Sequence, residues 1–145
     1  MTPRGVFLPD VNVLVALTDE SHVHHTVAQK WFDAEGHRAW ALCPLTEAGF
    51  LRVITRQQVG GRSMEEATKI LHQMGRHRGC RYWPLTVGWE EIAAPLSSRI
   101  FGHQQITDAW LLGLAIREHG VLVSFDRALK YLASDDFTRH LLVLG

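Results

Sequence analysis

Residues 6–10 read Val6-Phe7-Leu8-Pro9-Asp10, and an apolar stretch from Val11 to Leu17 follows them. The three apolar residues at the start have the character of a short buried strand, and Pro9-Asp10 ends it. The stretch after Asp10 is predicted to form a short helix over the edge of a sheet. Asp10 is therefore expected at the C-terminal end of a strand, next to the start of a helix.

The same alternation of short apolar runs and amphipathic stretches continues along the rest of the chain. It is typical of a parallel sheet covered by helices, so the predicted fold class is α/β. The segments 76–81 and 101–105 are predicted to be a basic connection and a polar loop. Further strands are predicted at 39–43, 121–125 and 141–144, and further helices at 21–35, 46–54, 63–74, 87–96, 108–119 and 127–132.

Local signals indicate where several of these helices begin and end. Thr46 is placed to cap the helix that follows Pro44, and Ser63 to Glu66 has the spacing of a capping box. Gly36 and Gly120 are predicted to stop the helices that precede them. The buried face of the helix at 21–35 is expected to carry Val23, Val27, Trp31 and Phe32.

The composition limits the class of protein. The chain has 145 residues, 46% of them hydrophobic and 21% charged, and this fits one soluble domain spanning residues 1–145. Lys and Arg number 15, as do Asp and Glu, so any nucleic-acid partner has to be held by local charge. With no secretory leader and no apolar run of about 20 residues, Cys43 and Cys80 are expected to be reduced thiols in a cytoplasmic protein.

Four acidic residues stand where the predicted elements meet. Asp10 and Asp126 each follow a predicted strand, and Glu47 follows another after a short turn. Asp108 opens a helix at the end that would face the same edge of the sheet. Because the active crevice of a parallel sheet lies beyond the carboxyl ends of its strands, these acids are expected to converge there.

The neighbours of two of these acids predict a metal site. Glu47 and Asp108 are each followed at helical spacing by apolar residues, so both carboxylates lie on stripes that face the core. A carboxylate that points inward is costly unless something neutralises it. Oxygen ligands suit Mg²⁺ or Mn²⁺, and one or two such ions can activate water to hydrolyse a phosphodiester.

Simpler interpretations exist for each signal alone. Asp108 and Asp126 are in positions where acids often cap helices, and Glu47 would complement a helix dipole. Capping is the better explanation for any single acid, whereas four acids directed at one sheet edge favour a shared site. His22 and His25 share a helical face, but zinc sites normally need four ligands, so a surface role is preferred.

Four short motifs resemble those of PIN-domain nucleases, and among these the VapC-type toxins of prokaryotic toxin–antitoxin pairs. The resemblance covers nearly the whole chain, and the order and spacing of the motifs carry it. The motifs are Leu8-Pro9-Asp10-Val11-Asn12, Leu45-Thr46-Glu47, Thr107-Asp108-Ala109-Trp110-Leu111-Leu112 and Ser124-Phe125-Asp126-Arg127.

The resemblance implies a PIN-like fold with about five parallel strands flanked by helices. It also implies Mg²⁺-dependent endoribonuclease activity, homodimerisation and a cognate antitoxin that blocks the site. Carried over by position, Asp10, Glu47, Asp108 and Asp126 would be the metal-binding and catalytic acids, with Asp10 and Asp108 closest to the ion. Asn12 and Thr107 would be polar residues that orient them.

Two other functions remain open from the sequence. The acidic pocket could belong to a binding module that only receives a basic peptide, although the presence of all four acids disfavours this. A metal nuclease that acts on DNA is also open, because an acidic metal site does not by itself recognise the 2′-hydroxyl group. The basic segment 76–81 could hold RNA phosphates, with a solvated surface loop as the preferred interpretation.

Overall fold

The computed structural model describes residues 5–56 and 61–145. Within these residues, one sheet contains five parallel strands in the order β3-β2-β1-β4-β5. The predicted α/β class is therefore confirmed. The strands are β1 (Phe7–Pro9), β2 (Trp40–Leu42), β3 (Cys80–Tyr82), β4 (Val121–Ser124) and β5 (Leu141–Val143).

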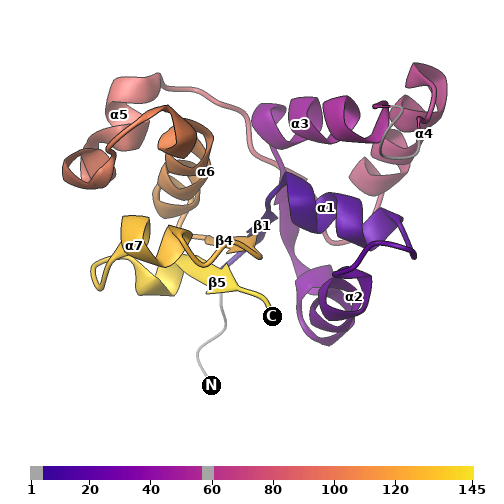
Figure 1. Cartoon of the computed structure of the whole chain (residues 1–145), viewed down its shortest axis with the longest axis horizontal. Helices are drawn as coiled ribbons and strands as arrows, with labels where there is room; N and C mark the ends of the chain where they lie inside the picture. Colours follow the sequence, from indigo (N-terminus) through magenta and orange to yellow (C-terminus); the bar gives the residue numbers. More distant parts are fainter. Residues whose placement is uncertain (1–4, 57–60) are drawn as a thin grey trace.

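Helices cover both faces of the sheet, with α1–α4 on one side and α5–α7 on the other (Figure 1). Successive side chains of a strand point to opposite faces, so Phe7 packs into the core under α1–α4 and Leu8 into the core under α5–α7. These helices are α1 (Val11–Thr18), α2 (His25–Ala34), α3 (Pro44–Ile54), α4 (Met64–Gly75), α5 (Trp89–Ala93), α6 (Ile106–Arg117) and α7 (Leu129–Ala133).

The order of the strands creates a switch point beside β1. The chain runs outward from β1 to β2 and β3, and then returns to β4 on the other side of β1. Connections therefore leave β1 and β4 in opposite directions, which opens a crevice at their carboxyl ends. Residues 7–9 pair in register with residues 121–123, so the two strands end level with each other. Asp10 and the turn after Ser124 lie at this crevice.

The helix predicted at 21–35 begins later than expected, at His25. A side-chain turn competes with the helix before it, because Asp19 Oδ1 accepts hydrogen bonds from the N–H and the hydroxyl of Ser21. Val23 is 86% exposed and Val27 is 36% exposed, so their predicted place on the buried face is wrong. Trp31 is buried there as expected, together with Ala28.

Two predicted helix ends also need correction. α3 begins at Pro44 with Cys43 as its N-cap residue, and Thr46 is the third helical residue, whose buried hydroxyl accepts a 3.1 Å hydrogen bond from the Cys43 N–H. After α6, the left-handed residue is His119 (φ 56°) instead of Gly120. Glycine at position 120 is required by packing instead, because a Cβ there would lie 2.5 Å from the ring of Trp83.

Three segments have more regular structure than their patterns indicated. The predicted basic connection 76–81 contains the start of β3, an edge strand whose Arg81 and Tyr82 are exposed, so no apolar run marked it. The predicted loop 101–105 includes the 3₁₀ turn η4 (His103–Gln105), and the predicted helix 87–96 divides into α5 and η3 (Ala94–Arg99). Across the described ranges, we find no helix with the length and apolar character needed to cross a membrane.

Candidate active site

Asp10 is fixed between the two strands at the switch point. Its backbone N–H donates to Val123 of β4 at 2.9 Å, and its Oδ1 accepts the Val13 N–H at 3.0 Å, which makes it the N-cap of α1. The Ser124 hydroxyl is also hydrogen-bonded to the Asp10 carboxylate. The side chain is only partly exposed, so its position is set by the ends of β1 and β4 together.

Asp126 lies in the turn that follows β4. Its backbone N–H donates to Ser124 Oγ at 3.0 Å, and its Oδ1 accepts the Ala128 N–H at 2.9 Å. Ser124 is 1% exposed and therefore joins Asp10 and Asp126 from within the protein. The Asp126 side chain is exposed, so this carboxylate reaches solvent and any substrate at the crevice.

Asp108 is the third residue of α6 and faces the same crevice from another element. Its helix begins at Ile106 after Gln105, so Asp108 is in the first turn but is not the N-cap residue. Leu111 and Leu112, three and four residues further, are buried in the core. The capping explanation thus applies to Asp10, whereas it does not account for Asp108.

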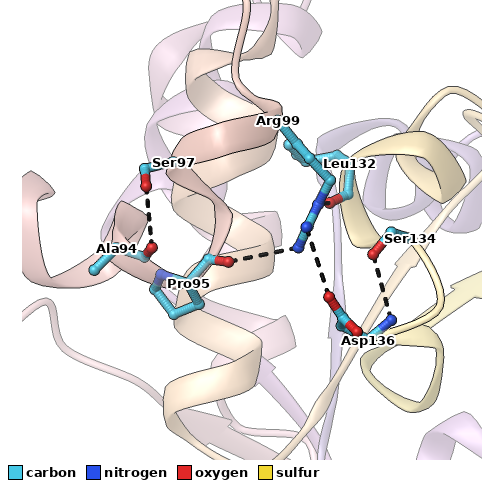
Figure 2. A network of polar contacts seen from close by, with 7 residues as sticks. All are labelled: Ala94, Pro95, Ser97, Arg99, Leu132, Ser134 and Asp136. Atoms are coloured by element: carbon cyan, nitrogen blue, oxygen red, sulfur yellow. Dashed lines mark hydrogen bonds and ion pairs between the residues drawn. The ribbon is translucent and has the colours of Figure 1, made fainter.

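A network around Arg99 anchors the segment that precedes α6 (Figure 2). Arg99 Nε donates to the carbonyl of Leu132 in α7 at 2.8 Å, and its Nη1 lies 3.7 Å from a carboxylate oxygen of Asp136. Gln105, directly before α6, reaches back to the Arg99 carbonyl at 3.5 Å. These contacts join η3 to α7 and help to fix the helix start that carries Asp108.

The pKa values of Asp10 and Asp108 show that the three aspartates act on one another electrostatically. Burial, together with the charges of Asp126 and Asp10, raises the pKa of Asp108 to about 6. Burial also raises the pKa of Asp10, with a further contribution from Asp126, although hydrogen bonds from Ser124 and Val13 oppose it. Asp10, Asp108 and Asp126 are therefore brought together as like charges in a partly desolvated crevice.

Glu47 has a different environment. It lies in the first turn of α3, as predicted, and its carboxylate is hydrogen-bonded to the Tyr82 hydroxyl. The charge of Glu47 acts on Tyr82 and on the Cys80 thiol, whereas the charges that raise the pKa of Asp108 come from Asp126 and Asp10. Glu47 therefore lies towards β3, beside the crevice of the three aspartates.

The donors at the crevice are consistent with a hard divalent cation. Among residues 5–56 and 61–145, no three His, Cys, Asp or Glu side chains are gathered closely enough to share one ion. Mg²⁺, however, is commonly held by only one or two carboxylates and retains several waters. Asp10 and Asp108 would be such a pair of oxygen ligands, and a cation would offset the burial and like charge that raise their pKa values.

The polar residues expected around the acids fit less closely. Asn12 and Thr107 are both exposed, each in the first turn of its helix. The backbone N–H of Asn12, instead of its amide, stabilises the Asp10 carboxylate. The sequence reasoning overlooked Ser124 as a supporting residue; its signal was a hydroxyl within the apolar run 121–125. Tyr82 beside Glu47 was also overlooked.

Comparison with known proteins identifies relatives over most of the chain. Residues 7–134 match the family described as PIN domain. Ribonuclease VapC38 of Mycobacterium tuberculosis is 41% identical over 128 residues, which cover 87% of this chain and 89% of the relative. Ribonuclease VapC44 of the same species is 36% identical over 139 residues, which cover 94% and 98%.

A solved structure has the same fold at low sequence identity. VapC20 of Mycobacterium tuberculosis, described as a Sarcin-Ricin loop cleaving toxin, superimposes with a TM-score of 0.65 at 14% identity, covering 92% of this chain and 97% of that chain. At 14% identity this likeness supports the fold alone. Membership of the family rests on the match over residues 7–134 and on the relatives at 36–41% identity. The chain belongs to the PIN-domain family, and its curated relatives there are VapC ribonucleases.

Proposed function

We propose that the protein is a Mg²⁺-dependent endoribonuclease and the toxin of a toxin–antitoxin pair. The observation that carries the proposal is the convergence of Asp10, Asp108 and Asp126 at the switch point, where burial and mutual charge raise the pKa of two of them. Relatives that bear the name ribonuclease, at 36–41% identity, support the substrate class. Mn²⁺ is the expected substitute metal, because it takes the same oxygen ligands.

Each acid has a role that follows from its position. Asp10 and Asp108, the two partly buried carboxylates, would be the metal ligands, and a bound Mg²⁺ would supply a water of lowered pKa for attack on the phosphodiester. Ser124 and the Val13 N–H hold the Asp10 carboxylate in place. Asp126 is exposed and oriented by the Ala128 N–H, so it can align the attacking water. Glu47, which is hydrogen-bonded to Tyr82, would contact the substrate instead of the metal.

The proposal includes a cognate antitoxin and a homodimer. A basic side chain of the antitoxin, preferably Arg, would enter among the aspartates, because its fork of donors satisfies paired carboxylates and replaces the charge of the metal. The antitoxin and Mg²⁺ would then compete for the same carboxylates. A structure of the inhibited complex with the antitoxin bound only to a distant face would contradict this part of the proposal.

An RNA cleavage assay tests the proposed activity. The purified protein should cleave RNA in Mg²⁺ or Mn²⁺ and stop in excess EDTA, and Asp10→Asn and Asp108→Asn should each lower the rate by at least about 100-fold. Asp33→Asn is the matched control, because Asp33 is exposed on α2 and its carboxylate accepts a hydrogen bond from the side chain of Gln29 in the same helix. Undiminished cleavage in EDTA would remove the metal mechanism, and equal cleavage of a DNA of the same sequence would remove RNA specificity.

A further inference from the structure

A groove lies beside the crevice of the aspartates, between α3, α4 and β3. Its volume is about 540 Å³, and its lining includes Glu47, His72, Arg76, Arg81 and Tyr82. Its lining runs from Arg76, shortly before the first residue of β3, to Glu47 and Tyr82, so the groove follows β3 and reaches the carboxyl ends of β2 and β3 at one end. The end at Glu47 and Tyr82 is at the same edge of the sheet as the three aspartates.

The groove carries positive charge that is available to a ligand. Within the described part of the chain, neither Arg76 nor Arg81 forms an ion pair, and both are exposed. Arg81 Nη1 donates to the Gly79 carbonyl at 3.0 Å, which fixes its guanidinium and leaves other N–H groups free to donate. His72 adds a further donor from α4. Two guanidinium groups on one groove match the charge and geometry of phosphates.

The groove also offers an aromatic surface. Tyr82 is 51% exposed, and its hydroxyl is hydrogen-bonded to Glu47. This bond orients the ring and occupies the one acidic side chain in the groove lining. An exposed aromatic ring beside basic groups is the combination with which proteins bind single-stranded nucleic acid, by stacking a base and contacting the backbone.

We propose that this groove is a subsite for the RNA strand next to the scissile bond, with its phosphates on Arg76 and Arg81 and a base on Tyr82. The inference rests on the proposed ribonuclease activity. In the sheet, β3 is two strands away from β1, and at about 4.8 Å between neighbouring strands this is about 10 Å. An RNA strand at the aspartates therefore reaches Tyr82 within a few nucleotides and can continue along β3 to the two arginines.

The basic segment provides a matched pair of variants. Arg76 lines the groove, whereas Arg78, two residues further, is exposed and does not line it. Binding of a labelled single-stranded RNA of about 12 nucleotides, within the usual range of site sizes, is measured by fluorescence anisotropy in EDTA. Arg76→Gln should weaken binding and reduce the slope of log K against log salt by about 0.7 per lost phosphate contact, with Arg78→Gln close to wild type.

Tyr82 gives a second, independent pair. Tyr82→Phe keeps the ring and should keep RNA affinity, whereas Tyr82→Leu should lose about tenfold if one base stacks there. Circular dichroism of each variant establishes that it is folded. If RNA affinity falls with Leu but not with Phe, the ring of Tyr82 stacks on a base. If it falls equally with both, the hydroxyl group acts through Glu47 instead.

The outcomes separate this inference from the proposed function. If wild type cleaves RNA but Arg76→Gln and Arg78→Gln are equal in affinity and salt slope, the groove is not the subsite and the proposed activity stands. If wild type neither binds nor cleaves RNA, both fail. Poly-glutamate provides the alternative ligand: if it binds in an Arg76-dependent way while RNA does not, the groove accepts an acidic protein segment and the inference is overturned.

Discussion

Two opposing electrostatic effects act on Asp108. A carboxylate in the first turn of a helix is usually stabilised by the helix dipole, by about 0.3–1 kcal/mol. The pKa of Asp108 is nevertheless raised, to about 6, because burial and the charges of Asp126 and Asp10 disfavour its ionised form. Desolvation and like charge therefore outweigh the dipole at this residue, which is the opposite of what an acid selected only for helix stability would show.

This shift predicts how the stability of the metal-free protein depends on pH. In the unfolded chain Asp108 ionises around pH 3.8, whereas in the folded chain it holds its proton to about pH 6. Between these values the folded state binds more protons, so the contribution of Asp108 to the free energy of unfolding falls as pH rises through this range. Above pH 6 the penalty is complete. Asp108→Asn, which cannot ionise, lacks the penalty.

Urea unfolding in EDTA between about pH 4 and pH 7 measures this effect. The stability of Asp108→Asn relative to wild type should increase with pH and level off above about pH 6. The exposed Asp33→Asn variant should show no such trend relative to wild type. A stability difference between Asp108→Asn and wild type that stays constant over the whole range would mean that Asp108 is not in a desolvated, acidic surrounding.

At the scale of elements, the placement of Asp108 depends on how α6 packs. Gly113 lies where α6 crosses α5, and a Cβ there would be 2.4 Å from the Ile92 carbonyl oxygen and 2.7 Å from Ile92 Cγ2. Only a residue without a side chain permits this close approach. The backbone of α5 cannot move aside freely, because Ile92 itself is buried in the core.

Gly113→Ala should therefore destabilise the protein by about 1–3 kcal/mol, since it overpacks a rigid contact. For a domain of this size, this corresponds to a fall in Tm of about 2–10 °C. Gly75→Ala is the matched control, because Gly75 is the last residue of α4 and a Cβ there meets no atom within 4 Å. It should be neutral or stabilising by up to about 1 kcal/mol. Equal melting temperatures for both variants would contradict the close packing.

The elements show what the sequence could and could not indicate. β1 and β4 were predictable because each is a buried apolar run that ends in a polar residue, and this also located Asp10 and Asp126. β3 was missed because an edge strand of three residues, with Arg81 and Tyr82 exposed, has neither an apolar run nor a clean alternation. The late start of α2 was missed because the turn around Asp19 depends on hydrogen bonds to Ser21.

At the scale of the whole molecule, the alternation of strands and helices predicted the fold class but not the order of the strands. That order puts β4 beside β1 and β2 on the other side, which is why Asp10 and Asp126 interact while Glu47 lies closer to Tyr82. Periodicity along the chain contains no information about which strands are neighbours. The supporting contact of Ser124 was hidden for the same reason, because it depends on two strands ending level with each other.

Metal binding should couple the crevice to the stability of the entire fold, because the ligands come from separate elements and are together only in the native state. Without metal, Asp10→Asn and Asp108→Asn each remove one of several repelling charges, and Asn remains a good N-cap at position 10. Both variants should therefore melt at or above the wild-type temperature in EDTA.

In Mg²⁺, wild type should instead melt at a higher temperature than Asp10→Asn and Asp108→Asn. A ligand that binds only the native state stabilises it by about 2.7 kcal/mol at 100 times its dissociation constant, so wild type should gain far more than either Asn variant. Asp33→Asn should respond to Mg²⁺ like wild type. Asp10→Ala, which also loses the cap to Val13, should be less stable than Asp10→Asn by about 1 kcal/mol, with or without metal. If the melting temperatures of all five proteins rise equally in Mg²⁺, the aspartates do not form a shared metal site, and their positions reflect helix capping and local turns alone.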